Sequence, residues 1–455
     1  MKRYFVLLIS IPLFYNISSG QKFFHRQELL NDADSLYSII NSIHPNMYAN
    51  INKPEFEYEL NMIKRHIKDS MNIIDFYNLI APLVVRIGDG HTSMFFPRNE
   101  LNYPHIKLFP FAVDIMKDDS SAVVINDYSE SGNTIPVGAK IIEINGKKIS
   151  SITEKMFQYT SGERPFFKAA VLAYTFTPLL YSIYRDSVFV VRYIYQNSDY
   201  TKFVRGVSYS QRYKPVSQTT TAYKNYSLSI DDEKKIAYID FVSFVDLKKF
   251  RKFLDSAYTV IKEKDIIDII IDVRQNGGGN SALGDEFFQY ISRVPFKQFG
   301  KTVVKTSPRQ ISSYKENHIK CSKKVGIKTY EDDNLIPLRK NKLRHTGNYY
   351  LLTSNFTFSS AADFSWAFKY FKMGTVVGEE TGGLAVCFGD VISQYLPNTK
   401  MYFGVSYKLF YNYGATDNDI HGTIPDYIVP ADNAKDCAID LILETRRSFN
   451  PFKNQ

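Results

Sequence analysis

Two short segments of the sequence combine residue types that could carry out acyl-transfer chemistry. The first is Asp272–Gly279, which ends in three consecutive glycines and follows the apolar run Ile266–Ile271. Such a run predicts a buried parallel strand. Glycines after the strand allow a sharp turn and a close approach of the backbone to another group. Amide groups on a loop of this kind can stabilise a developing oxyanion.

The second segment, Thr357–Asp363, predicts a serine at a turn between a strand and a helix. It follows the apolar strand Tyr349–Leu352. A serine at this turn lies at the positive end of the helix dipole. Ser359 and Ser360 are the candidates for a nucleophile, although a serine here could also simply cap the helix. The apolar positions that predict the helix are Phe364, Ala367, Phe368 and Phe371.

A histidine and two late aspartates could complete such a site. His91 lies in the glycine-punctuated loop Arg86–Thr92. With an unperturbed pKa of about 6.5, histidine suits a general base at neutral pH. His91 could equally be a surface residue, and Asp417 and Asp419 could be turn residues. The sequence has no zinc, EF-hand or Walker motif, so we expect neither a metal ion nor another cofactor.

The pattern of apolar residues divides the chain into four parts. A basic start, a short apolar run and small residues before Gln21 predict a cleaved signal peptide, residues 1–20. Residues 21–104 predict a helical cap that ends in the His91 loop. Residues 105–215 contain short apolar strands, and residues 216–455 alternate strands with helices. The three helices expected in the cap are approximately 29–43, 55–67 and 73–85.

Within residues 105–215, the pair Asn145-Gly146 between two apolar runs is a strong hairpin signal. The stretch Ile135–Ile149 around this pair resembles the central hairpin of a PDZ domain. We expect a helical insertion at about 152–184, a strand at Val188–Tyr193 and a polar linker at Ser208–Lys224. PDZ domains bind extended peptide ends by adding a strand to a sheet edge. This part of the chain therefore predicts a peptide-binding unit.

Residues 216–455 predict an α/β domain with a largely parallel sheet, which would form the catalytic core. The stretch at about 300–347 has no clear periodicity and is basic, which predicts a loop insertion near the site. The regular elements expected before it are strands Ile236–Ile239 and Ile266–Ile271 and helices Phe250–Ile261 and Leu283–Ile291.

The composition is that of an ordinary globular protein of 455 residues. The formal net charge is +9, but the basic residues are dispersed, so nucleic-acid binding is not expected. After the leader, we expect no stable membrane span. The three cysteines, Cys321, Cys387 and Cys437, are too few for disulfides to be the main source of stability, and any pairing stays open.

Taken together, the motifs resemble one family of serine peptidases. It contains the C-terminal processing (tail-specific) proteases, the tricorn core protease and the repeats of interphotoreceptor retinoid-binding protein. The resemblance spans nearly all of the mature chain and implies a core of spiralled βαβ units of the crotonase and Clp-protease kind. The segments that carry it are Gly88–Thr92, Val137–Gly146, Asp272–Gly279, Ser359–Asp363, Gly378–Gly383 and Gly422–Asp426.

The family has two catalytic arrangements, and the resemblance favours the tricorn-like one. The processing proteases use a Ser–Lys dyad, whose lysine falls in the segment that matches Gly378–Ala385. Here Leu384 or Ala385 takes the place of the lysine, and an apolar side chain cannot accept a proton from serine. The tricorn-like arrangement takes its base from the loop that carries His91.

The resemblance implies a role for each matched residue. Ser360 would be the nucleophile and His91 the general base. The amides of Gly278 and Ala361 would form the oxyanion hole.

The third group of the site is implied less directly. Asp419, three residues before Gly422, is the best match for the orienting acid, and Asp417 is the alternative. The tricorn enzyme also carries a serine directly before its histidine. Gly90 takes that place here, so this hydroxyl is missing.

These features predict an exported serine endopeptidase. It would hydrolyse unfolded or partly degraded polypeptides through a Ser–His acyl-enzyme mechanism. The alternative is a catalytically inactive peptidase-like protein that binds peptide ends or small hydrophobic ligands. We expect peptides or unfolded proteins as partners, leave the oligomeric state open, and expect the mature chain in the periplasm, at the cell surface or outside the cell.

Overall fold

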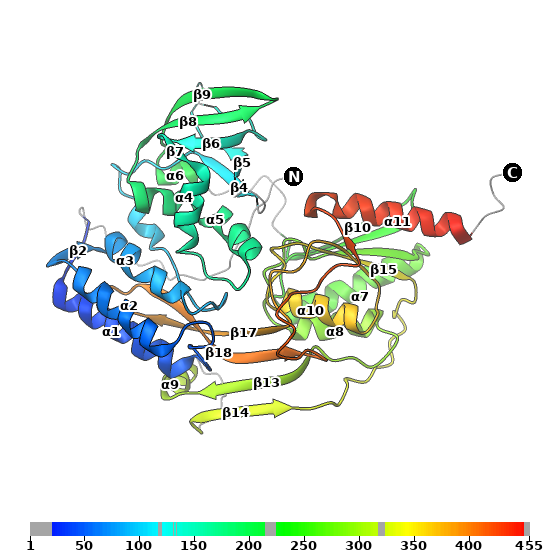
Figure 1. Ribbon diagram of the computed structural model, residues 1–455. Helices are drawn as coiled ribbons and strands as arrows, with labels where there is room; N and C mark the ends of the chain where they lie inside the picture. The colour runs from blue at the N-terminus through cyan, green and yellow to red at the C-terminus, as the bar shows by residue number, and fades with distance from the viewer. Residues whose placement is uncertain are drawn as a thin grey trace.

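The computed structural model of the chain describes residues 21–116, 121–130, 132, 134–213, 224–316 and 324–449. Within these residues, three helices, an antiparallel domain and an α/β core follow one another along the chain (Figure 1). The expected signal peptide, Cys321 and most of the expected linker lie outside the described residues. Cys387 and Cys437 carry free thiols.

The N-terminal part forms the three helices that its periodicity predicts. They are α1 (Arg26–Ile43), α2 (Lys53–His66) and α3 (Ile73–Val85), with the short strands β1 (Phe23–His25) and β2 (Ser70–Asn72) paired beside them. Asparagine residues are the N-caps of α2 and α3. The side chain of Asn52 accepts a hydrogen bond from the Glu55 amide, and that of Asn72 accepts one from the Asp75 amide. The short strand β3 (Ser93–Met94) follows the His91 loop.

The described residues between 105 and 213 form one antiparallel sheet with two main helices. The strands are β4 (Phe111–Ile115), β5 (Ala122–Asp127), β6 (Lys140–Ile144), β8 (Val188–Tyr195) and β9 (Ser198–Arg205), in that order, and β7 (Lys147–Lys148) pairs with β6. Asn145 and Gly146 both have positive φ, +50° and +72°, as a tight hairpin turn requires. The predicted hairpin, the predicted strand and the helical insertion are confirmed; the likeness to a PDZ domain stays a prediction.

The insertion consists of α4 (Ile149–Phe157) and α5 (Pro165–Tyr184), and the short helix α6 (Tyr209–Arg212) follows β9. By length and composition alone, α5 could cross a membrane. However, it packs on β4 and half of its apolar stretch is buried inside the protein. A core helix of a water-exposed domain meets the same criterion, so α5 is weak evidence for a membrane span.

The C-terminal part is the predicted α/β core. Its sheet has the order β10-β11-β12-β15-β16-β19, and all neighbours are parallel except β10 and β11. The strands are β10 (Tyr226–Asp231), β11 (Ile236–Phe241), β12 (Asp268–Asp272), β15 (Asn348–Thr353), β16 (Thr375–Gly378) and β19 (Tyr427–Ile428). The helices are α7 (Leu247–Glu263), α8 (Ala282–Ile291), α10 (Ser360–Tyr370) and α11 (Ala434–Phe449).

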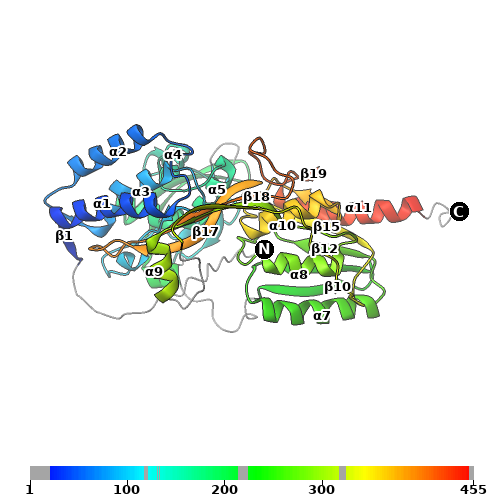
Figure 2. The same cartoon turned by 90° about the horizontal axis from the view of Figure 1, so that it is seen from below.

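A second sheet connects this core to the N-terminal helices. Its order is β14-β13-β18-β17, and β3 also pairs with β18. Figures 1 and 2 show the long strands β17 (Val386–Tyr395) and β18 (Tyr402–Asn412) running from the α/β core to α1 and α3. Apolar residues of this hairpin, among them Ile392, Phe403 and Val405, belong to the same buried core as the helices.

The expectation of an irregular loop over about 300–347 is wrong for the described residues up to Glu331. This stretch contains β13 (Phe299–Thr306), α9 (Pro308–Glu316) and β14 (Gly326–Glu331). Every residue of β14 is exposed, so it carries no alternation of buried and exposed residues. The two strands form because β13 pairs with β18, more than 100 residues later, and such non-local pairing overrides weak local signals.

A buried carboxylate fastens the hairpin to the first helix. Asp32 of α1 is fully buried and accepts hydrogen bonds from the amides of Asn398 and Thr399, both at 2.8 Å. It also accepts the Thr399 hydroxyl at 2.6 Å. Asp32 therefore supplies the hydrogen-bond acceptors for two backbone amides in the turn between β17 and β18.

We predict that Asp32→Ala lowers the free energy of unfolding by about 3 kcal/mol, because several buried donors lose a charged acceptor. Asp34→Ala on the same helix is the matched control. The side chain of Asp34 is 59% exposed and pairs with Lys64, so its loss should cost less than about 1 kcal/mol. Urea unfolding of both variants measures the difference, and equal losses would contradict this role of Asp32.

Candidate active site

The glycine loop after β12 lies against the start of α10. Gly278 has φ +97°, and a Cβ atom there would lie 2.6 Å from the Cβ of Ser359. Asn276 anchors the loop: its Nδ2 donates to the Phe241 carbonyl at 2.7 Å and its Oδ1 accepts the Gly278 amide at 2.8 Å. Only glycine allows the two backbones to come this close.

The turn between β15 and α10 is the predicted elbow, and it is strained. Ser359 has φ +54° and ψ −134°, a region that residues other than glycine rarely occupy. Two side chains hold the turn against the segment that follows β12 and leads into the glycine loop. Ser354 Oγ donates to the Arg274 carbonyl at 2.6 Å, and Thr357 Oγ1 donates to the Val273 carbonyl at 2.9 Å. Ser354 therefore has a structural role.

Ser360, the predicted nucleophile, is the first residue of α10 and is only 3% exposed. Its hydroxyl donates to the Gly279 carbonyl at 2.8 Å and lies 2.8 Å from the hydroxyl of Ser281. The hydroxyl is thus held by the glycine loop rather than by a base.

The structure brings the predicted nucleophile and the predicted base to one place. A small cavity, about 20 Å³, is lined by residues from the His91 loop, the glycine loop, the elbow and the β17–β18 sheet. The polar side chains around it are His91, Ser281, Ser359, Ser360, Asp363, Cys387 and Asp390. Residues separated by almost 270 positions in the sequence therefore share one buried site.

Asp89 holds the His91 loop in this position. Its Oδ1 accepts the His91 amide at 2.8 Å, and its Oδ2 accepts the Ser406 hydroxyl at 2.6 Å. His44 lies 3.2 Å from the same Oδ2 through its Nε2. Since the Nδ1 of His44 accepts the Asn46 amide, its Nε2 carries the proton and donates to Asp89.

The charge on Asp89 follows from these contacts. Burial alone would raise the pKa of the Asp89 carboxyl. The hydrogen bond from His44, the fields of His44 and His91, and the hydrogen bond from Ser406 instead hold this pKa well below its usual range. Asp89 is therefore an ionised carboxylate, with its Oδ1 at 3.9 Å from the Nδ1 of His91.

The imidazole of His91 is available as a base. Among the described residues, neither ring nitrogen has a partner in good hydrogen-bond geometry. Burial lowers the pKa of His91, although the fields of Asp89 and Asp390 and an interaction with the backbone of Phe388 oppose this effect. The ring stacks on Phe358 at 4.4 Å between centroids, and Phe358 stacks in turn on Phe167 of α5 at 4.2 Å. A neutral imidazole is the form that can accept a proton.

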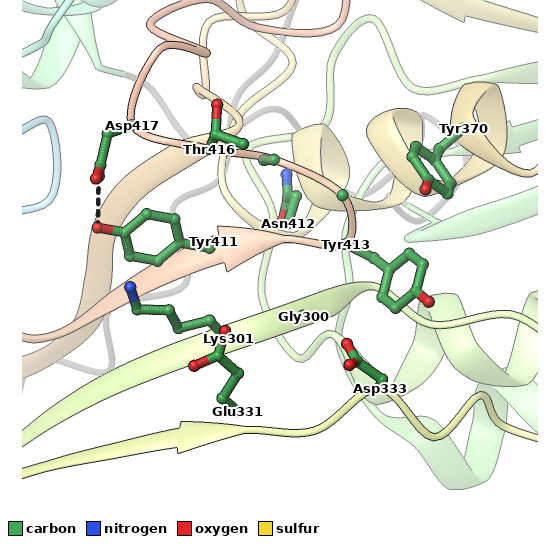
Figure 3. Close-up of a pocket in the computed structure, with 12 residues that line it drawn as sticks. Gly300, Lys301, Glu331, Asp333, Tyr370, Tyr411, Asn412, Tyr413, Thr416 and Asp417 are labelled. Atoms are coloured by element: carbon green, nitrogen blue, oxygen red, sulfur yellow. Dashed lines mark hydrogen bonds between the residues drawn. The ribbon is translucent and has the colours of Figure 1, made fainter.

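The structure does not bring the two candidate acids to His91. Asp419 accepts the amide and the hydroxyl of Thr416 at 2.7 and 2.9 Å, and its nearest histidine is His421, at 3.7 Å. Asp417 accepts the Tyr411 hydroxyl at 2.7 Å and lines a separate cavity of about 470 Å³, as Figure 3 shows. Their catalytic role stays a prediction.

The two predicted oxyanion donors are engaged within the chain. The Gly278 amide donates to Asn276 Oδ1, and the Ala361 amide donates to the Phe358 carbonyl at 3.1 Å. The two segments do lie together, because a Cβ on Gly278 would be 2.9 Å from the Ser360 amide nitrogen. The oxyanion hole stays a prediction as well.

Sequence reasoning missed three acidic groups: Asp363 and Asp390 line the cavity, and Glu163 accepts a hydrogen bond from the amide of Gly90, next to His91. Burial raises the pKa of Asp363 to about 8 and that of Glu163 also to about 8. Asp390 pairs with Lys408 at 2.5 Å. Asp363 could have been found from its place on the first turn of α10, but Glu163 lies in a segment with no motif. A neutral, buried carboxyl group is uncommon away from functional sites.

Comparison with known proteins agrees with this architecture. Residues 235–429 match the model of peptidase family S41. A crystal structure of mature CPAF is similar to this chain, with a TM-score of 0.65 and 11% identity, covering 94% of this chain and 99% of that one. A structure of mature CPAF complexed with lactacystin has a TM-score of 0.65 and 11% sequence identity, and the match covers 93% of this chain and 98% of that one. No curated protein matches the chain in sequence.

The photosystem II D1 C-terminal processing protease is a more distant structural match. Its TM-score is 0.45 at 13% identity, with coverages of 89% and 94%. The α/β core with its glycine loop and serine elbow defines a serine-type peptidase. The family model of peptidase S41 matches the α/β core, residues 235–429, and the predicted resemblance to this family and the predicted fold class are confirmed.

We predict that Gly278→Ala lowers peptidase activity at least about tenfold, because a methyl group there displaces Ser359 and the start of α10 and misplaces the reacting groups. Gly138→Ala is the matched control. Gly138 has a similar φ, +88°, but no atom lies within 4 Å of a Cβ built there. Hydrolysis of an unstructured peptide measures both variants. Equal activities would show that the close contact at Gly278 is unimportant.

Proposed function

We propose that the protein is an exported serine endopeptidase that cleaves unfolded or partly degraded polypeptides through a Ser–His acyl-enzyme mechanism. The observation that carries this proposal is the shared cavity of His91 and Ser360 in a fold of peptidase family S41. The absence of a lysine at Leu384 or Ala385 leaves His91 as the candidate base.

In this mechanism, Ser360 Oγ attacks the scissile carbonyl carbon and His91 accepts its proton. The imidazolium then returns the proton to the leaving amine, and water hydrolyses the acyl-enzyme with His91 again as the base. Rotation about one side-chain bond of Ser360 would release its hydroxyl from the Gly279 carbonyl and turn it into the cavity. The amides of Gly278 and Ala361 would stabilise the oxyanion after a local rearrangement.

The proposal leaves more than one candidate for the acid that orients His91. Asp419 and Asp417 are the candidates from family resemblance, and Asp419 would reach the site only if its loop moved. Asp89 already lies beside His91, carries a negative charge and fixes the histidine backbone. A carboxylate in this position stabilises an imidazolium as it forms.

Export and substrate class follow from other parts of the chain. The leader at residues 1–20 supports secretion, with a mature N-terminus near Gln21 and a location in the periplasm, at the cell surface or outside the cell. The antiparallel domain at 105–215 supports the binding of extended chains, because strand addition uses backbone hydrogen bonds and tolerates many sequences.

We predict that Ser360→Ala and His91→Ala each lower kcat at least about 10³-fold and abolish labelling by a fluorophosphonate probe. Ser359→Ala, one residue earlier, is the matched control and should still be labelled. If Ser359→Ala is inactive and Ser360→Ala is active, the nucleophile is Ser359. An unlabelled wild-type protein would support the non-catalytic binder instead.

The same assay gives the pH dependence. Because burial lowers the pKa of His91, the enzyme should keep its activity below pH 6.5, the ordinary value of histidine. The value of kcat/KM should then fall as the imidazole becomes protonated, since an imidazolium cannot accept a proton.

We predict that a peptide with a free C-terminal carboxylate is cleaved faster than the same peptide with a C-terminal amide. The reason is that a PDZ-like unit binds the end of a chain as well as its extended backbone. Values of kcat/KM for the two peptides test this. Equal values would show that the domain at 105–215 does not select chain ends.

A further inference from the structure

A carboxyl group from the antiparallel domain reaches the active site. Glu163 lies in the segment between α4 and α5, and its Oε1 accepts the Gly90 amide at 3.0 Å. Gly90 directly precedes His91. The hydrogen bond therefore fixes the Asp89–Gly90 peptide unit, while Asp89 accepts a hydrogen bond from the next amide, that of His91.

The second oxygen of Glu163 fills the space beside Gly90. A Cβ built on Gly90 would lie 2.9 Å from Glu163 Oε2 and 2.9 Å from Phe358. Among the described residues, this oxygen is buried without a hydrogen-bond partner. Buried polar atoms are rarely left unpaired, so an unpaired carboxyl oxygen next to a candidate base calls for a functional explanation.

The surrounding contacts dock the segment that carries Glu163 onto the core. Arg164 donates to the Ile420 carbonyl at 3.4 Å and lies 3.5 Å from Glu380, whose other oxygen accepts the Gly422 amide at 2.9 Å. Phe167, on the first turn of α5, stacks on Phe358, which covers the His91 ring. Two side chains of the domain at 105–215, Glu163 and Phe167, thus support the His91 loop.

We propose that Glu163 is a positioning residue of the active site, which holds His91 in its catalytic place through Gly90 and makes that place depend on docking of the antiparallel domain. This inference rests on the proposed function, since it assumes that His91 is the base. A positioning role for Glu163 also accounts for the glycine at position 90. The carboxyl group of Glu163 occupies the space that a side chain at position 90 would need.

The protonation state of Glu163 gives the test. Burial, and then the field of Asp89, raise its pKa to about 8, while the hydrogen bond from Gly90 opposes the shift. The groups that face it are Asp89 and the buried thiol of Cys387, and Arg164 points away toward Glu380. Above about pH 8, a second negative charge beside Asp89 would repel it and displace the His91 loop.

The experiment compares Glu163→Ala, Glu163→Gln and the control Glu154→Ala, in which an exposed glutamate of α4 is removed. The readout is the rate of fluorophosphonate labelling of the full-length mature protein from pH 6 to 10, with melting temperature as a check on folding. We expect Glu163→Ala to label at least tenfold more slowly at pH 7 than Glu154→Ala. Glu163→Gln keeps a neutral acceptor for the Gly90 amide, so we expect it to restore most of the labelling.

The pH profile separates positioning from a merely structural role. Wild-type labelling should decline above about pH 8, and Glu163→Gln should lack this decline because an amide does not ionise. Labelling of Glu163→Ala at the wild-type rate would overturn the inference, and so would identical pH profiles for Glu163→Gln and the wild type. Failure of the proposed function looks different, because the wild-type protein itself would then not be labelled.

Discussion

The candidate active site depends on one buried carboxylate, Asp89. It accepts hydrogen bonds from His44 at the end of α1, from Ser406 of β18 and from the amide of His91. These three groups belong to the N-terminal helices, to the sheet that contains β17 and β18, and to the His91 loop, respectively. A buried charge is tolerated only when it is fully paired, so the partners of Asp89 must assemble together. The candidate base lies outside residues 235–429, the part that matches the family, and Asp89 brings it to the serine.

A second constraint acts on the other side of the site. The backbone at Gly278 approaches Ser359 so closely that no side chain fits, and Ser359 takes a backbone conformation that costs on the order of 1–3 kcal/mol. The hydrogen bonds of Ser354 and Thr357 to the backbone just after β12 hold this strained turn in place. Strain of this kind is expected where a serine must be presented at the start of a helix.

Local patterns in the sequence were enough to predict the elements that carry the site. The apolar run before Asp272, the glycines after it, the helical spacing from Phe364 and the pair Asn145-Gly146 each depend on neighbouring residues only. Contacts between distant segments were not readable. The strand β13 forms because of β18, and Glu163 reaches Gly90 from a segment with no motif. For the same reason, the position of Asp419 near Gly422 in the sequence did not reveal that its carboxylate faces Thr416 and His421.

The central claim is that Ser360 and His91 form the reacting pair, although Ser360 Oγ rests on the Gly279 carbonyl in this structure. The most direct test is fragmentation mass spectrometry of the wild-type protein after fluorophosphonate labelling, because it identifies the serine that carries the adduct. We predict a single adduct on Ser360. An adduct on Ser359 or Ser281, which border the same cavity, would contradict it.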